Sequence, residues 1–170
     1  MELKNYIRDI PDFPQEGILF RDITPMLHDP AAYGKMIDTL CAQLDGIEVD
    51  YVVGPEARGF LLGAPMALKM GAGFVPVRKP GKLPYDTIKE SYDLEYGSNT
   101  IEMHSDALKA GDRVVIVDDL LATGGTAAAA CRLCEKMGAK VVAVSFAVEL
   151  CDLKGREALK DYKVYSVLQY

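Results

Sequence analysis

The 170-residue sequence predicts an α/β fold with a mainly parallel central sheet flanked by helices. Three observations lead to this fold class. The run Val114–Val117 consists of four consecutive β-branched residues, which suits a strand buried on both faces. Strand-like runs alternate with helix-like segments along the chain, which implies parallel βαβ units with right-handed crossovers. The length fits a single domain, residues 1–170.

The first half of the chain begins with an irregular segment and continues as helix and strand in turn. Residues 1–28 contain prolines and show no clear periodicity, so we expect an irregular N-terminal segment. Asp29 and Pro30 are typical of the N-cap and first turn of a helix, which should end near Gly46. The elements expected next are a buried strand at 51–53, a helix over 59–70 closed by Gly71, and a strand over 74–77 whose Pro76 favours an edge position.

Residues 79–104 differ in kind from the segments on either side, because they are polar and have few apolar anchors. Such a long connection is typical of a flexible loop over a binding site. Two alternating stretches within it, 92–96 and 100–103, suit the two strands of a hairpin. After the central strand we expect a helix ending at Gly138, a buried strand over 141–150 and a last strand over 164–170. Ligands of such sheets bind at the carboxyl ends of the strands.

The composition excludes several classes of function. Acidic residues outnumber basic ones by 25 to 19, and the net charge of −6 argues against a protein that binds nucleic acid through phosphate contacts. No apolar run approaches the length that spans a membrane, and the N-terminal residues lack the apolar core of a secretory signal. We therefore expect a cytoplasmic protein with neither a membrane nor a nucleic acid as its partner.

Four cysteines are present, and two of them, Cys131 and Cys134, have C-x-x-C spacing. Redox pairs of this kind lie at helix starts, where the helix dipole lowers the thiol pKa, whereas these two fall well inside a predicted helix. A zinc site is poorly supported, since no second pair accompanies them. We expect reduced cysteines that act as small buried apolar residues.

The segment that follows the central strand carries the most chemical information. Asp118 and Asp119 stand where that strand should end, and a glycine-bearing turn then leads into an alanine-rich helix. Such a turn presents free backbone N–H groups and the positive end of the helix dipole, which together bind phosphate. Carboxylates accept hydrogen bonds from hydroxyls. The segment therefore predicts a sugar-phosphate pocket, whose phosphate cradle is Ala122, Thr123, Gly124, Gly125 and Thr126.

Further motifs accompany this segment in a fixed order. They are Asp12–Pro14 with Gly17 and Phe20–Pro25, then Glu56–Phe60, Arg78–Lys79, Gly81–Pro84 and Leu94–Gly97. Together with residues 114–130 they resemble the adenine phosphoribosyltransferase family of type I phosphoribosyltransferases. The resemblance runs essentially from end to end.

The resemblance implies a fold, a reaction and a set of partners. The fold would be that of type I phosphoribosyltransferases, with residues 1–28 covering the base and residues 79–104 forming a flexible active-site loop. The reaction would transfer the phosphoribosyl group from phosphoribosyl diphosphate to adenine, giving AMP and diphosphate. Mg²⁺ would arrive on the diphosphate of the substrate rather than in a protein cage. The resemblance also implies a homodimer.

Phosphoribosyl transfer builds positive charge on the ribose and negative charge on the departing diphosphate, so the enzyme needs cations beside the diphosphate. Arg58 is the best candidate, because a guanidinium grips phosphate oxygens bidentately. The supporting cations would be Arg78, Lys79 and Lys82. Asp118 and Asp119 would hold the ribose 2- and 3-hydroxyls.

For the base, the resemblance assigns main-chain groups of Leu19, Phe20 and Arg21 to adenine. A main-chain N–H and C=O can pair with the acceptor nitrogen and the 6-amino group of adenine, and a 6-oxo purine reverses one of those needs.

Two residues of the Leu94–Gly97 motif complete the expected site. Glu95 matches the loop glutamate that the family uses for proton transfer near the purine, although Glu90 and Glu102 also stand in this segment. Tyr96 would position the loop over the site and exclude water.

Two other functions stay open at this stage. The first is a phosphoribosyltransferase for a 6-oxo purine or xanthine, against which the N-terminal and Leu94–Gly97 motifs count. The second is a regulator that senses phosphoribosyl diphosphate. A regulator that binds nucleic acid should carry a basic surface or a helix-turn-helix, and this acidic chain shows neither.

Overall fold

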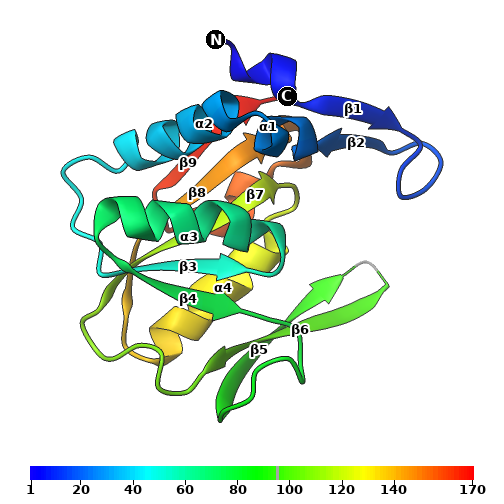
Figure 1. Cartoon of the computed structure of the whole chain (residues 1–170). Helices are drawn as coiled ribbons and strands as arrows, with labels where there is room; N and C mark the ends of the chain where they lie inside the picture. The colour runs from blue at the N-terminus through cyan, green and yellow to red at the C-terminus, as the bar shows by residue number, and fades with distance from the viewer. Residues whose placement is uncertain (95) are drawn as a thin grey trace. The chain divides into compact units, whose positions relative to one another are not determined.

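The chain folds into two units, Met1–Thr39 and Leu40–Tyr170, in a computed structural model that describes residues 1–94 and 96–170 (Figure 1). The first unit contains a 3₁₀ turn (η1), a short antiparallel ribbon, the helix α1 and the beginning of α2. Their bounds are Leu3–Tyr6 for η1, Arg8–Pro11 for β1, Leu19–Asp22 for β2, Thr24–His28 for α1 and Pro30–Ala42 for α2.

The prediction that residues 1–28 are irregular is therefore wrong for this ribbon. Its strands are only four residues long and contain a single buried residue, so they carry no apolar alternation that a sequence pattern would reveal. Instead, polar contacts join them: Arg8 donates to the Asp22 carboxylate at 2.7 and 3.1 Å. The predicted N-cap of the next helix is confirmed, because the Asp29 side chain accepts the N–H of Ala32 at 2.9 Å. That helix ends at Ala42 rather than near Gly46.

The second unit is built on a five-stranded parallel sheet with the order β4-β3-β7-β8-β9. The strands are β3 (Tyr51–Pro55), β4 (Gly73–Val77), β7 (Arg113–Leu121), β8 (Lys140–Glu149) and β9 (Val164–Gln169), with α3 (Arg58–Met70) after β3 and α4 (Gly125–Lys136) after β7. This confirms the predicted fold class. The position of β4 at one edge also agrees with the presence of Pro76.

The order of the strands reverses between β3 and β7. From β3 the chain moves outward to β4 in one direction, and from β7 it moves to β8 in the opposite direction. Right-handed crossovers then place α3 and α4 on opposite faces of the sheet, as Figure 1 shows. The crevice beyond the carboxyl ends of β3 and β7 is the position at which such sheets bind ligands.

A β-hairpin occupies most of the segment between β4 and β7. Its strands, β5 (Thr87–Leu94) and β6 (Gly97–His104), pair over their whole length, which confirms the predicted hairpin and extends it. The hairpin joins the main sheet through two backbone hydrogen bonds between Arg78 and Glu102, with N···O distances of 2.9 and 2.7 Å. The segment expected to cover the site is therefore anchored directly beside β4.

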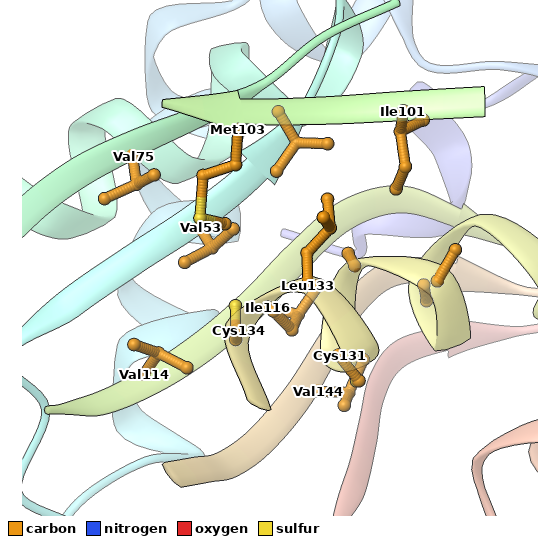
Figure 2. Close-up of a cluster of buried hydrophobic side chains, with 14 of the residues drawn as sticks. Val53, Val75, Ile101, Met103, Val114, Ile116, Cys131, Leu133, Cys134 and Val144 are labelled. Carbon is orange, nitrogen blue, oxygen red and sulfur yellow. The ribbon is translucent and has the colours of Figure 1, made fainter. Parts of the chain in front are cut away.

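The hydrophobic core of this unit lies between the sheet, α4 and the hairpin. In Figure 2, Ile101 and Met103 of β6 point down from the hairpin toward α4 and the sheet, where Leu133 of α4 lies beside Ile116 of β7. All four of these side chains are at most 5% exposed. The core therefore packs the hairpin, the central strand and α4 against one another.

The two cysteines with C-x-x-C spacing are buried in α4, which confirms their predicted structural role. Burial raises the pKa of the Cys131 thiol to about 12 and also raises the pKa of Cys134, so neither forms a thiolate readily. Cys41 and Cys151 are likewise reduced, because neither forms a disulfide. Among the helices of the described residues, none has the length and apolar character needed to cross a membrane.

We predict that Leu133→Ala lowers the free energy of unfolding by about 2–5 kcal/mol, because it leaves a cavity beneath the hairpin. Urea unfolding measures this as a lower midpoint with an unchanged slope. The matched control is Leu68→Ala, since Leu68 lies on α3 and is 85% exposed. The control should change stability by less than about 0.5 kcal/mol. Equal shifts in the two variants would contradict the assigned core.

Candidate active site

The acid pair lies inside the central strand rather than after it. The strand β7 runs on to Leu121, and Asp118, Leu120 and Leu121 all pair with residues of β8. The prediction that the strand ends at Val117 is therefore wrong. Two carboxylates interrupt the apolar run, but the backbone hydrogen bonds continue because they do not depend on the side chain.

The two carboxylates have different partners. Asp119 is buried and accepts a hydrogen bond from Arg58 Nε at 2.5 Å. Asp118 Oδ1 accepts the backbone N–H of Asp119 at 2.8 Å. Burial raises the pKa of Asp118 well above its ordinary value of 3.8, the charge of Asp119 raises it further, and Arg58 opposes both effects. The strand thus presents one ion-paired acid beside one that resists ionisation.

The glycine turn that follows β7 leads directly into α4, as predicted. Gly124 caps the helix with φ = +85°, a left-handed conformation that favours glycine. The first turn of any α-helix has backbone N–H groups without intrahelical partners, and here they open onto a hollow of about 220 Å³. The residues of the predicted phosphate cradle that line this hollow are Ala122, Thr123, Gly124, Gly125 and Thr126.

A larger cavity of about 570 Å³ adjoins this hollow and shares four lining residues with it: Tyr92, Asn99, Asp118 and Thr126. The predicted site residues that line the larger cavity are Arg58, Arg78, Lys79, Asp118, Asp119 and Thr126. They come from the ends of β3, β4 and β7 and from the start of α4. The structure therefore brings a phosphate cradle, an acid pair and three cations together at the crevice between β3 and β7.

The comparisons with known proteins agree with this geometry. Residues 26–169 match the phosphoribosyl transferase domain family. An adenine phosphoribosyltransferase of Carboxydothermus hydrogenoformans is 57% identical over 170 residues, which is the full length of both chains. The chain belongs to the adenine phosphoribosyltransferase family.

Solved structures of this family share the fold. The crystal structure of adenine phosphoribosyltransferase from Thermoanaerobacter pseudethanolicus has a TM-score of 0.97 and 51% identity, with 99% of this chain and 98% of that chain covered. The enzyme from Saccharomyces cerevisiae, complexed with D-2,5-dideoxy-2,5-imino-altritol 1,6-bisphosphate and adenine, has a TM-score of 0.91 and 45% identity, with 96% and 95% covered. The predicted type I phosphoribosyltransferase fold is thus confirmed.

The remaining predicted site residues lie elsewhere. Lys82 is exposed and is not among the residues that line the two cavities. Tyr96, at the tip of the hairpin, is 92% exposed. Glu95 lies outside the described residues, so its role stays a prediction.

Glu90, an alternative to Glu95 in the proton-transfer role, is held against α4. Its carboxylate forms ion pairs with Lys136 at 2.6 Å and Arg132 at 3.2 Å, both on α4. The hydrogen bond from Lys136 and the one from Arg132 lower the pKa of Glu90. Glu90 therefore anchors the hairpin on α4, which counts against a role in purine proton transfer.

The predicted base-binding residues lie on β2 in the N-terminal unit. Leu19 is 45% exposed. The ring of Phe20 packs edge-to-face on Phe13 with a centroid distance of 5.1 Å, and Arg21 donates to Asp9 at 2.5 Å. These contacts hold the side chains of Phe20 and Arg21 within the N-terminal unit. The adenine-binding role of all three residues stays a prediction.

Sequence reasoning missed two polar residues of the cavity. Glu56 Oε1 accepts hydrogen bonds from the backbone N–H of Lys79 at 2.7 Å and from Arg78 Nε at 3.3 Å. Glu56 therefore holds the segment that carries Arg78 and Lys79 close to the end of β3. The hydroxyls of Tyr92 and Thr126 are 2.9 Å apart, within hydrogen-bond distance. The only available signals were the Glu56–Phe60 motif and the alternation within the hairpin, and neither reveals a partner more than twenty residues away.

We predict that Asp118→Asn raises the stability of the protein at pH 7. The raised pKa of Asp118 means that the native state binds its proton more tightly than the unfolded state does, so wild-type stability falls as pH rises from about 4 through that raised pKa. Asparagine removes this charge and keeps the oxygen that accepts the Asp119 N–H. Each unit of pKa shift is worth about 1.4 kcal/mol.

Calorimetry at pH 7 and at about pH 3.5 measures the effect, since a 1 kcal/mol gain moves the midpoint by about 2–4 °C in a chain of this size. The gain should become small at the lower pH, where the carboxyl is mostly protonated in both states. The exposed Asp161→Asn is the matched control and should show no gain at pH 7. A lower midpoint for Asp118→Asn at pH 7 would show that the carboxylate is not a stability cost.

Proposed function

We propose that this chain transfers the 5-phosphoribosyl group from phosphoribosyl diphosphate to adenine, giving AMP and diphosphate in a purine salvage step. The observation that carries the proposal is the set of groups around the two adjoining cavities. A phosphate cradle at the start of α4, the acids Asp118 and Asp119, and the cations Arg58 and Arg78 follow one another along the crevice. The phosphate cradle, the acids and the cations match, in that order, the 5-phosphate, the ribose and the diphosphate of the donor.

At the phosphate end, the N–H groups of residues 122–126 bind the 5-phosphate, with the hydroxyls of Thr123 and Thr126 as further donors. The ribose lies against β7, where Asp118 and Asp119 accept hydrogen bonds from its hydroxyls. The carboxylate of Asp119, which forms an ion pair with Arg58, also stabilises the positive charge that develops on the ribose as its bond to the diphosphate breaks. Placement of the sugar supplies most of the orientation that the reaction needs.

At the other end, Arg58, Arg78 and Lys79 bind the diphosphate, and Lys82 joins them from the segment that precedes β5. Negative charge grows on the diphosphate as it leaves, so these cations stabilise the transition state more than the bound donor. Arg58 is fixed in place by Asp119 through its Nε, and Arg78 by Glu56. The site is therefore preorganised for a departing anion.

The base binds through the N-terminal unit. Main-chain groups of Leu19, Phe20 and Arg21 pair with adenine, which donates from its 6-amino group where hypoxanthine or guanine accepts. Glu95 takes the proton that adenine loses as N9 attacks, and Tyr96 brings the hairpin tip over the base to exclude water.

Mg²⁺ enters with the donor. Within residues 1–94 and 96–170, no three His, Cys, Asp or Glu side chains gather as a metal site. The cavity instead pairs its cations with Asp118 and Asp119, which suits an ion held by diphosphate oxygens and its own waters with the acid pair nearby. When bound, the ion neutralises part of the diphosphate charge.

Two further properties belong to the proposal. The enzyme acts in the cytoplasm, which agrees with four cysteines that form no disulfide, two of them buried. It forms a homodimer, as the family resemblance implies. No nucleic acid or membrane takes part.

The test incubates the purified protein with phosphoribosyl diphosphate, Mg²⁺ and each purine base in turn, and follows nucleotide formation. AMP from adenine alone is the expected result. Turnover with hypoxanthine, guanine or xanthine instead would keep the donor site and reject the adenine pocket. Tight donor binding without any nucleotide product would indicate a sensor of phosphoribosyl diphosphate rather than an enzyme.

The site assignment has its own test, the double variant Asp118→Asn with Asp119→Asn. We expect a loss of turnover of at least about 10²–10³-fold, the usual scale for removing groups that stabilise transition-state charge. The double variant of the exposed Asp106 and Asp161, both changed to Asn, removes the same charge and should retain activity. Near-wild-type rates in the first variant would contradict the roles given to the acid pair.

A further inference from the structure

A short segment after β8 lies in direct contact with the glycine turn. Its 3₁₀ turns are η2 (Cys151–Leu153) and η3 (Gly155–Leu159). A Cβ atom added to Gly124 would lie 2.6 Å from the Gly155 carbonyl oxygen, and one added to Gly155 would lie 2.5 Å from the Ala122 carbonyl oxygen. The two backbones therefore touch, with no side chain between them. Gly155 therefore packs directly against the turn that binds the 5-phosphate in the proposed function.

The residue next to Gly155 forms an ion pair with the end of β8. Arg156 donates from Nε and Nη2 to the two carboxylate oxygens of Glu149, at 2.8 and 2.9 Å. This is a bidentate fork, the geometry that combines charge with a fixed orientation. Arg156 Nη1 also donates to the Val164 carbonyl at 3.0 Å. The guanidinium thus joins η3 to the last residue of β8 and to the first residue of β9.

The acceptor of this fork is fixed as firmly as the donor. Glu149 is the last residue of β8 and is 5% exposed. Ser166 donates to its Oε2 at 2.6 Å, and Gln169 does so at 3.3 Å. The hydrogen bond from Arg156 is the main reason why the pKa of Glu149 is lowered to about 2. The carboxylate therefore stays charged at neutral pH.

We propose that Arg156 and Glu149 are positioning residues for the 5-phosphate site. Their ion pair clamps Gly155 against Ala122 and Gly124, and this contact fixes the direction in which the backbone N–H groups of the turn point. Neither residue is among those that line the two cavities, so they act through the turn and not on the ligand. The inference rests on the proposed function only in taking this turn as the binding site of the 5-phosphate.

Loss of the Arg156–Glu149 ion pair should weaken binding of the 5-phosphate and leave binding of the diphosphate unchanged. AMP carries the 5-phosphate that the turn binds, whereas diphosphate binds the cations at the ends of β3 and β4. A merely structural ion pair, if lost, would weaken both ligands together or would lower the melting temperature alone. The ratio of the two affinities therefore separates a positioning role from a structural one.

The experiment measures the dissociation constants of AMP and of Mg²⁺-diphosphate by titration calorimetry for wild type, Arg156→Gln and Arg156→Lys. We expect Arg156→Gln to weaken AMP binding by about tenfold or more while diphosphate binding stays within about twofold, since an interaction of roughly 1.4 kcal/mol corresponds to a factor of ten. Arg156→Lys keeps the charge without the fork and should restore part of the AMP affinity. The KM for phosphoribosyl diphosphate should be lowest for wild type, higher for Arg156→Lys and highest for Arg156→Gln.

Arg113→Gln is the matched control. Arg113 forms ion pairs with Asp50 and Glu48 at the start of β7, the opposite end of the strand, so its loss should leave both affinities unchanged. If Arg156→Gln fails to fold, Ser166→Ala removes one hydrogen bond to Glu149 and should produce the same selective loss of AMP affinity to a smaller degree.

An unchanged AMP affinity in the Arg156 variants, or an equal loss for AMP and diphosphate, would overturn the positioning role. Failure of the wild-type protein to bind AMP is a different result. It would overturn the 5-phosphate site itself and, with it, the role of the clamp.

Discussion

The hydrogen bond between Arg58 and Asp119, 2.5 Å long, joins the two sides of the crevice on which the site depends. Arg58 begins the helix after β3, and Asp119 lies in β7, the neighbouring strand across the point where the strand order reverses. The cation that we propose for the diphosphate and the acid that we propose for the ribose are thereby fixed side by side. Because both groups are held by each other before a ligand arrives, little reorganisation is needed during the reaction.

The same arrangement has a cost in stability. Two adjacent carboxylates stand in a strand whose preceding residues are apolar. Asp119 forms an ion pair with Arg58, whereas Asp118 resists ionisation because of its burial and its neighbour. Selection for folding alone would favour uncharged residues at these positions. Such conflicts between local rules and the fold are typical of functional sites. Around the pair, the packed layer of sheet, α4 and hairpin supplies the stability that tolerates it.

The fold could be predicted from the sequence to a large extent, because its strands and helices follow local apolar patterns. The strand at residues 51–55, the helix ending before Gly71 and the helix after Gly124 are all examples. The central part of the site was also accessible, since residues 118–126 are contiguous in the chain. Two features had no local signal. The exposed β1–β2 ribbon carries no apolar alternation, and the extension of β7 through its acid pair depends on backbone bonds to β8.

The contacts between distant residues were out of reach for the same reason. Glu56 supports a segment more than twenty residues away, and Gly155 contacts a turn about thirty residues before it. No periodicity links such positions, so only the folded chain brings them together.

A crystal structure of the enzyme with bound AMP tests the central claim most directly. It should place the 5-phosphate on the backbone N–H groups of residues 122–126 and the ribose hydroxyls on Asp118 and Asp119. A phosphate bound instead by Arg58 and Arg78, with the glycine turn empty, would reverse the orientation of the nucleotide and contradict the site described above.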